Sequence, residues 1–147
     1  QGMTTRFRTQ FLKRHMSDQH SSLDHLLVAF EVTDPLRARL RRVLSALPGE
    51  VQRDFTEDPR FCIRPLSRKK SCESLLALPA PDGTGSRCVV LKKRLASCSQ
   101  AFGFYVIAHE LAHAYLRNGP WQQFADPEEA ADALAASWGF DKPASWF

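Results

Sequence analysis

One segment constrains this chain more than any other. From Ala101 to Leu116 nearly every residue is apolar, and no proline interrupts the run. A helix that is apolar on almost all sides has to be buried by its neighbours. We therefore predict a central helix that other segments surround. Ser97, with Gln100 three residues later, predicts a capping box at its start, and Asn118-Gly119-Pro120 predicts its end.

Three polar residues, His109, Glu110 and His113, interrupt the apolar run. Residues four positions apart share a helix face, so both imidazoles can reach one metal ion. Glu110 projects beside that face, where its carboxylate can hold a water molecule at an open coordination position. The alternative is that these histidines are hydrogen-bonded core residues. Because unpaired polar groups are costly on so apolar a helix, we favour a zinc site that satisfies all three.

A catalytic zinc site needs a third protein ligand, and carboxylates are the candidates because no further histidine follows the pair in the sequence. Asp126 and Pro127 predict a second helix, as its N-cap and first residue. Glu128 and Asp132 share a face of that helix, whereas Glu129 is rotated by about 100°. We therefore predict Glu128 as the ligand and Asp132 as the acceptor that orients a ligand histidine, with Glu129 as the alternative ligand. Without a metal, acidic residues there would simply complement the helix dipole.

These motifs resemble a known group of proteins. The pair His109-Glu110-Leu111-Ala112-His113 and Glu128-Glu129-Ala130-Ala131-Asp132 is similar to that of gluzincin-type zincin metallopeptidases, which combine a HExxH helix with a later Glu-x-x-Ala-Asp helix. Similar pairs occur in HtpX-like membrane peptidases and in the small ImmA/IrrE-like proteins. In size and in its lack of membrane spans, this chain is closer to the latter. The resemblance covers residues 88–140 and leaves the N-terminal half unmatched.

The resemblance implies a zinc-dependent peptidase in which His109, His113 and Glu128 bind Zn²⁺ and Glu110 is general base and acid. It also implies that the strand before the active helix receives an extended substrate by strand addition, a role for residues 88–91 with Val89, Val90 and Leu91 as candidates. Many gluzincins stabilise the oxyanion with a downstream Tyr or His. This sequence has no His after 113 and no Tyr after 115, so that role is unassigned, and Arg117 is one candidate.

The rest of the chain predicts an α+β fold around the central helix. Apolar spacing and turn signals predict helices over 23–30, 36–47 and 50–55, strands over 61–64 and 88–91, a short apolar element at 75–78 and a turn at 79–86. Asp34-Pro35 marks the start of the second helix and Pro48-Gly49 its end. By its resemblance, we expect a zincin-like arrangement with a small sheet packed on the HExxH helix and additional N- and C-terminal helices.

The length of 147 residues suits one domain, because it can bury one core but not two. Residues 3–22 are polar and lack periodicity, so we expect a flexible or frayed N-terminal arm before a single zincin-like metallopeptidase domain over 23–147. Gln1-Gly2 before Met3 is typical of a cleaved tag. We see no apolar run of bilayer length and no secretory signal, and so expect a cytoplasmic protein without membrane contact.

Charge and cysteine content narrow the partners. The net charge of +4 is a mild excess, so nucleic-acid binding is not expected, and the basic runs 68–70 and 92–94 are interpreted as solvated charge. The four cysteines show no Cys-x-x-Cys pair. We expect free thiols, with two disulfides as the alternative.

Two functions of different classes remain open from the sequence. The leading hypothesis is a zinc metallopeptidase that hydrolyses a peptide or protein substrate through a zinc-activated water. The alternative is a non-catalytic or regulatory zincin-like module that holds metal for structure and binds protein or nucleic acid. An open coordination position discriminates between them, because only the enzyme requires one.

Overall fold

The computed structural model describes residues 23–66, 87–117 and 126–145. Over these residues the fold is α+β, as expected. The elements are the helices α2 (Pro35–Ala46) and α3 (Gly49–Glu57), the strands β1 (Phe61–Pro65) and β2 (Arg87–Leu91), the short 3-10 helix η2 (Lys93–Ala96), and the helices α4 (Gln100–Leu116) and α5 (Pro127–Ser137). No helix in these ranges has the length and apolar character that a bilayer span requires. The predicted arm, the 75–78 element, the 79–86 turn and the 118–120 stop signal lie outside the described residues.

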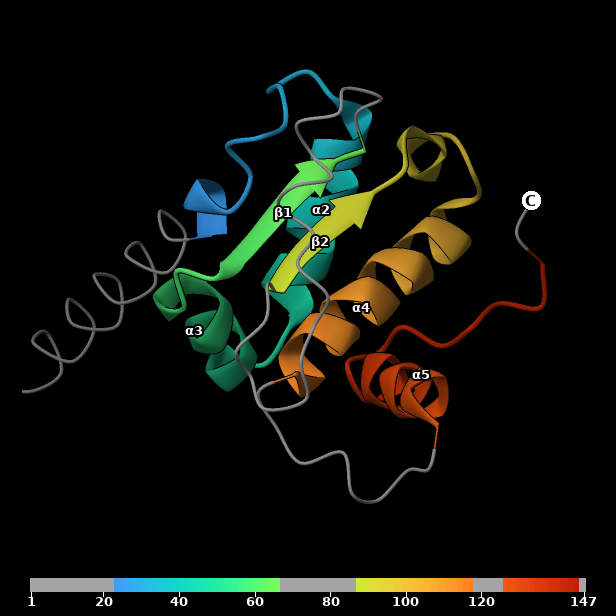
Figure 1. Cartoon of the computed structure of the whole chain (residues 1–147). Coiled ribbons are helices and arrows are strands. Elements are labelled where there is room, and N and C mark those ends of the chain that lie inside the picture. Colours follow the sequence, from blue (N-terminus) through green and yellow to red (C-terminus); the bar gives the residue numbers. More distant parts are fainter. Residues whose placement is uncertain (1–22, 67–86, 118–125, 146–147) are drawn as a thin grey trace, which may run out of the picture.

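The helix α4 lies at the centre of the described fold, between the sheet and α2 on one side and α5 on the other (Figure 1). Its contacts with α2, α3, β2, η2 and α5 account for its apolar sequence. The residues that it buries completely or nearly so are Ile107, Ala108, Leu111, Ala112 and Ala114. The prediction of a central, buried helix is therefore confirmed.

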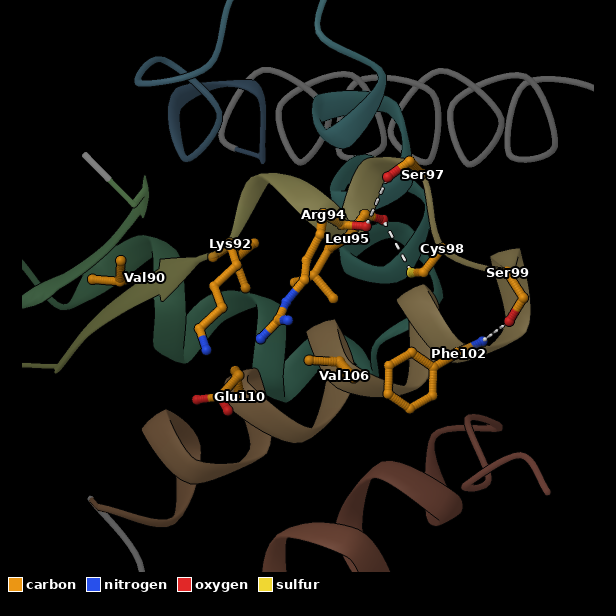
Figure 2. A pocket seen from close by; sticks show the side chains of 11 residues that line it. Val90, Lys92, Arg94, Leu95, Ser97, Cys98, Ser99, Phe102, Val106 and Glu110 are labelled. Carbon is orange, nitrogen blue, oxygen red and sulfur yellow. Dashed lines mark hydrogen bonds between the residues drawn. The ribbon is translucent and has the colours of Figure 1, made fainter. Parts of the chain in front are cut away.

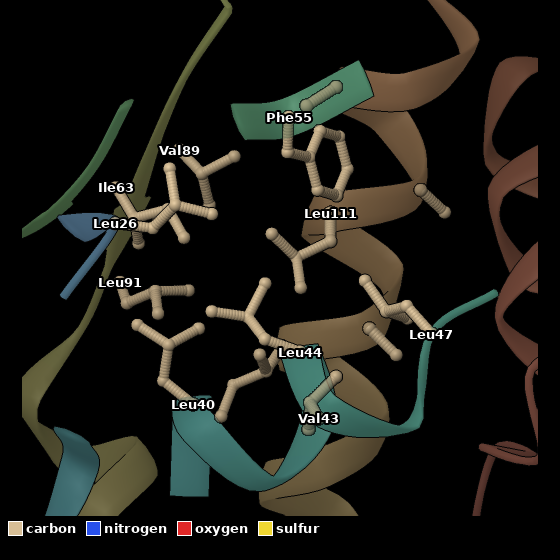
Figure 3. Close-up of a cluster of buried hydrophobic side chains, with 14 of the residues drawn as sticks. Leu26, Leu40, Val43, Leu44, Leu47, Phe55, Ile63, Val89, Leu91 and Leu111 are labelled. Carbon is tan, nitrogen blue, oxygen red and sulfur yellow. The ribbon is translucent and has the colours of Figure 1, made fainter. Parts of the chain in front are cut away.

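The sheet consists of β1 and β2, which run parallel with Phe61 opposite Arg87 and Pro65 opposite Leu91. Side chains alternate between the two faces of a strand. Accordingly Ile63, Val89 and Leu91 face the core, where they meet leucines of α2 and α4 (Figure 3). The described cysteines, Cys62, Cys88 and Cys98, form no disulfide, in agreement with the prediction of thiols.

Local capping signals fix the ends of two helices. The Asp34 carboxylate accepts a hydrogen bond from the Leu36 amide at 2.9 Å, and Pro35 takes the first helical position. Asp126 does the same for α5, accepting from the Glu128 amide at 3.0 Å. These side chains satisfy amide groups that a helix start leaves without a partner.

The predicted capping box at Ser97 is wrong. The N-cap of α4 is Ser99, whose hydroxyl accepts a hydrogen bond from the Phe102 amide at 3.3 Å. Ser97 instead closes η2, with its amide and its hydroxyl both donating to the Arg94 carbonyl. The 3-10 turn uses the residues that the capping box would need, so α4 begins later.

The predicted helix over 23–30 is also largely wrong. Only residues 23–25 are helical, and turns follow, with hydrogen bonds from Leu26 to Leu23 and from Phe30 to Leu27 that span three residues instead of four. Leu26, Leu27 and Phe30 are nevertheless buried. Consecutive turns repeat at close to helical spacing, so the apolar pattern located the buried residues but not the backbone conformation.

Gly103, near the start of α4, leaves room for the side chain of Arg39 from α2. An added Cβ there would lie 2.7 Å from Arg39 Nη1 and 3.1 Å from the Leu95 carbonyl oxygen. The space is needed because Arg39 Nη1 donates a hydrogen bond to that carbonyl at 2.7 Å. This bond connects α2 to η2 beside the start of α4.

A buried arginine joins three elements at the other end of α4. Arg87 on β2 is 1% exposed, pairs with Asp54 and Asp58 at the end of α3, and donates from Nε to the Ala114 carbonyl of α4 at 3.0 Å. Its guanidinium also lies 5.8 Å from the ring centroids of Phe55 and Phe61. These contacts supply the partners that a buried cation needs.

We expect Arg87→Met to lower the free energy of unfolding by about 3 kcal/mol, because it leaves Asp54 and Asp58 without their buried cation. Arg60→Met is the matched control, since Arg60 pairs with Asp58 from an exposed position, where ion pairs contribute little, and it should cost much less. Urea unfolding followed by circular dichroism measures both. Equal losses in the two variants would contradict this role of Arg87.

Candidate metal centre

The structure brings together the three residues predicted to bind metal. His109 and His113 lie one turn apart on α4, and Glu128 reaches them from the first turn of α5. The two Nε2 atoms are 3.1 Å apart, and the Glu128 carboxylate oxygens lie 2.9 Å from His109 Nε2 and 3.2 Å from His113 Nε2. These three residues form a group that could hold a metal ion.

The spacing of the candidate ligand atoms is close to the ligand–ligand distance of a tetrahedral zinc site. With zinc–nitrogen bonds of about 2.0–2.1 Å, tetrahedral ligand atoms lie about 3.3 Å from one another. The two Nε2 atoms are 3.1 Å apart, which is close to that value, and Glu128 places Oε2 2.9 Å from His109 Nε2 and Oε1 3.2 Å from His113 Nε2. Two imidazoles and one carboxylate are also a donor set that catalytic zinc sites use. The donor set and its spacing are therefore compatible with a zinc ion.

A hydrogen bond on the far side of His109 determines which ring nitrogen faces the group. His109 Nδ1 lies 2.8 Å from Asp132 Oδ1, and a carboxylate can only accept, so Nδ1 carries the hydrogen. With Nδ1 held by Asp132, the ring directs Nε2 toward the Glu128 carboxylate, 2.9 Å away. A proton or a metal ion at Nε2 makes that contact attractive. Asp132 thus occupies the orienting position predicted from the sequence.

Tyr105 contacts Asp132 next to the metal group, and this role was not predicted from the sequence. Its hydroxyl donates to the same Asp132 oxygen at 2.6 Å, and the tyrosine is buried. Burial and the bond to Asp132 raise the pKa of Tyr105, so the phenol stays protonated and remains a donor. The sequence does contain an indication of this role, because Tyr105, His109 and His113 recur every four residues and so share one helix face.

Two of the carboxylates of α5, those of Glu128 and Asp132, are held in their ionised form. Burial would raise the pKa of Glu128, but the charges and hydrogen bonds of His113 and His109 outweigh it and lower that pKa. For Asp132, burial is likewise outweighed, here by the bonds from Tyr105 and His109, and the pKa is lowered. Ionised carboxylates are what a metal ligand and its orienting partner both require.

Glu129, the alternative ligand, is exposed and is not part of the group. The rotation of neighbouring helical residues separates it from Glu128, as the spacing argument predicted. The Glu128 side chain is itself 67% exposed, whereas His109 and His113 are 12% and 20% exposed. The group is therefore anchored in the protein on the α4 side and open toward solvent on the α5 side.

Glu110 lies on the neighbouring face of α4 and lines a cavity of about 780 Å³ (Figure 2). Of the predicted substrate-strand residues, Val90 and Leu91 also line this cavity, whereas Val89 faces the hydrophobic core (Figure 3). Glu110 is half-buried and directly follows His109 in α4, so it lines the cavity from the same helical turn that carries a candidate ligand.

Arg117, a candidate for oxyanion stabilisation, caps the C-terminus of α4 and is half-buried. Burial and the charge of Arg87 lower its pKa, while the charge of Glu110 works in the opposite direction. Arg117 is thus close enough to Glu110 for their charges to interact. Its role in stabilising an oxyanion stays a prediction.

Comparison with models of known families, with curated proteins and with solved structures finds no match to this chain. The functional argument therefore depends on the residues and geometry described above.

We expect the protein to bind one zinc ion, and Glu128→Gln to weaken that binding by more than about 100-fold, because it removes one of three ligands. Glu129→Gln removes the same charge one residue away and should leave the affinity unchanged. Zinc titration with a competing chromophoric chelator measures both. If the two variants lose affinity equally, the assignment of Glu128 is wrong.

The role of the hydrogen bond between His109 and Asp132 can be tested separately. Asp132→Asn keeps the size of the side chain but removes the charge that receives the His109 hydrogen, and should weaken zinc binding by about ten- to hundred-fold. Asp126→Asn is the control, since asparagine also caps helices well and the Asp126 side chain accepts a hydrogen bond from the Glu128 amide, not from a candidate metal ligand's side chain. Unchanged zinc affinity in Asp132→Asn would show that Asp132 does not orient the ligand.

Proposed function

We propose that this chain is a zinc-dependent metallopeptidase with a zincin-like fold, which hydrolyses peptide bonds. The observation that carries the proposal is the convergence of His109, His113 and Glu128 on one point, with Glu110 beside them at the edge of a cavity. When bound, zinc would supply a Lewis acid that polarises the scissile carbonyl and lowers the pKa of water.

The protein residues have separate tasks in the proposed reaction. Glu110 accepts a proton from the attacking water on a carboxylate oxygen and later delivers it to the leaving amine nitrogen. Asp132 holds the His109 ring in one orientation through Nδ1, and the Tyr105 hydroxyl holds Asp132. The half-buried position of Glu110 limits competing contacts with bulk water.

The composition of the group favours an enzyme over a module that holds metal for structure. Structural zinc sites are closed by four protein ligands, whereas catalytic sites use three and keep one position open. Within the described residues the group contains three candidate ligands. The exposed side chain of Glu128 also leaves an approach from solvent. Both observations support a site that accepts substrate.

The sheet offers a way to bind an extended peptide. Within the part of the chain that the structure describes, β2 pairs with β1 alone, and its last residues line the cavity next to Glu110. A peptide that added to this edge would receive main-chain hydrogen bonds along β2 and would pass close to the proposed general base. This arrangement supports the proposal that the substrate is a peptide or an unfolded protein segment.

Glu110→Gln should keep zinc but reduce peptide hydrolysis by about 100-fold or more, because glutamine cannot accept the proton. His113→Ala should lose both zinc and hydrolysis, and Glu129→Gln should lose neither. Casein, an unfolded protein, is incubated with each variant, and mass spectrometry measures the peptides released. The zinc content of each variant is measured in parallel. Hydrolysis by Glu110→Gln at the parent rate would rule out Glu110 as the base.

A further inference from the structure

The cavity beside the metal group runs along one face of α4, from Glu110 to Phe102 (Figure 2). Phe102, Val106 and Glu110 are four residues apart and so share that face. Residues of the segment 90–99 form the opposite wall. The volume of about 780 Å³ lies within the range of about 300–1,000 Å³ that ligand sites occupy.

Two cationic side chains line this cavity, Lys92 and Arg94. Both extend from the opposite wall toward α4 and the side of Glu110 (Figure 2). Neither forms an ion pair with another residue that the structure describes. Because Glu110 is the one acidic residue among the described lining residues, the charge of the lining is positive.

The rest of the lining is mostly apolar and is firmly supported. Leu95, Phe102 and Val106 contribute the main apolar side chains on the two walls. The Leu95 carbonyl accepts a hydrogen bond from Arg39 at 2.7 Å, which connects η2 to α2. The cavity thus combines a supported apolar surface with two cations at the end that Glu110 occupies.

We propose that the substrate is an anionic peptide, which places an apolar side chain against Phe102 and Val106 and a carboxylate at Lys92 and Arg94. The carboxylate belongs to an Asp or Glu side chain or to a free C-terminus. Clefts lined by charge of one sign concentrate ligands of the opposite sign. The inference depends on the proposed peptidase function, since it specifies which peptides reach Glu110.

The test uses the zinc-loaded full chain and synthetic peptides that share an apolar core and differ at one neighbouring position, which is Glu, Gln or Lys. Each peptide is made with a free and with an amidated C-terminus, which separates the two sources of the carboxylate. Rates of hydrolysis give kcat/KM for the parent protein. Fluorescence anisotropy gives binding to the Glu110→Gln variant, so that binding is measured without turnover.

We expect the Glu peptide, or the free-acid form, to be favoured over its Lys or amidated counterpart by about five-fold or more at low salt. The preference should fall as salt screens the charges. Lys92→Glu combined with Arg94→Glu should reverse it. Lys93→Glu is the matched control, because Lys93 lies between them in the sequence but does not line the cavity, and the preference should persist.

The outcomes separate this inference from the peptidase proposal. Hydrolysis of all peptides at equal rates, unchanged by charge reversal at Lys92 and Arg94, would overturn the inference while leaving the peptidase intact. Charge-dependent binding without any hydrolysis would overturn the peptidase and leave the cavity as an anionic-peptide site. Neither hydrolysis nor charge-dependent binding would overturn both.

Discussion

The hydrogen bond between His109 Nδ1 and Asp132 Oδ1 is the contact on which the site depends. It links α4 and α5, together with the Tyr105–Asp132 hydrogen bond and the contacts of Glu128 with both histidines. It satisfies one nitrogen of a partly buried imidazole, turns the other toward the metal group, and brings the first turn of α5 over α4, so that Glu128 reaches both histidines. An unpaired polar ring on so apolar a helix would be costly.

The position of α4 itself is fixed at both ends by contacts that lie outside the site. Near its start, Gly103 leaves room for Arg39 to cross and bond the Leu95 carbonyl. Near its end, Arg87 bonds the Ala114 carbonyl, one residue after His113. Along α5, alanines face α4 and allow the close approach that short carboxylate side chains need. The geometry of the metal group is therefore a consequence of packing throughout the described fold.

Local and periodic signals predicted much of this arrangement. The helix spacing of Glu128 and Asp132 distinguished them from Glu129, and the structure places all three as that spacing predicted. Tyr105 was missed although it shares the face of the two histidines, because packing alone accounts for a tyrosine in an apolar helix. Arg87 gave no signal at all, since its carboxylate partners lie far away in the sequence. The capping box predicted at Ser97 was wrong because the 3-10 turn that replaces it depends on tertiary contacts, which the local sequence does not reveal.

The central claim is that α4 and α5 together hold one metal ion. Anomalous diffraction at the zinc absorption edge, from crystals grown with zinc, tests it most directly. The account predicts one strong peak at about 2.0–2.2 Å from His109 Nε2, His113 Nε2 and a Glu128 carboxylate oxygen. A peak at other residues, or none at this position at saturating zinc, would contradict it.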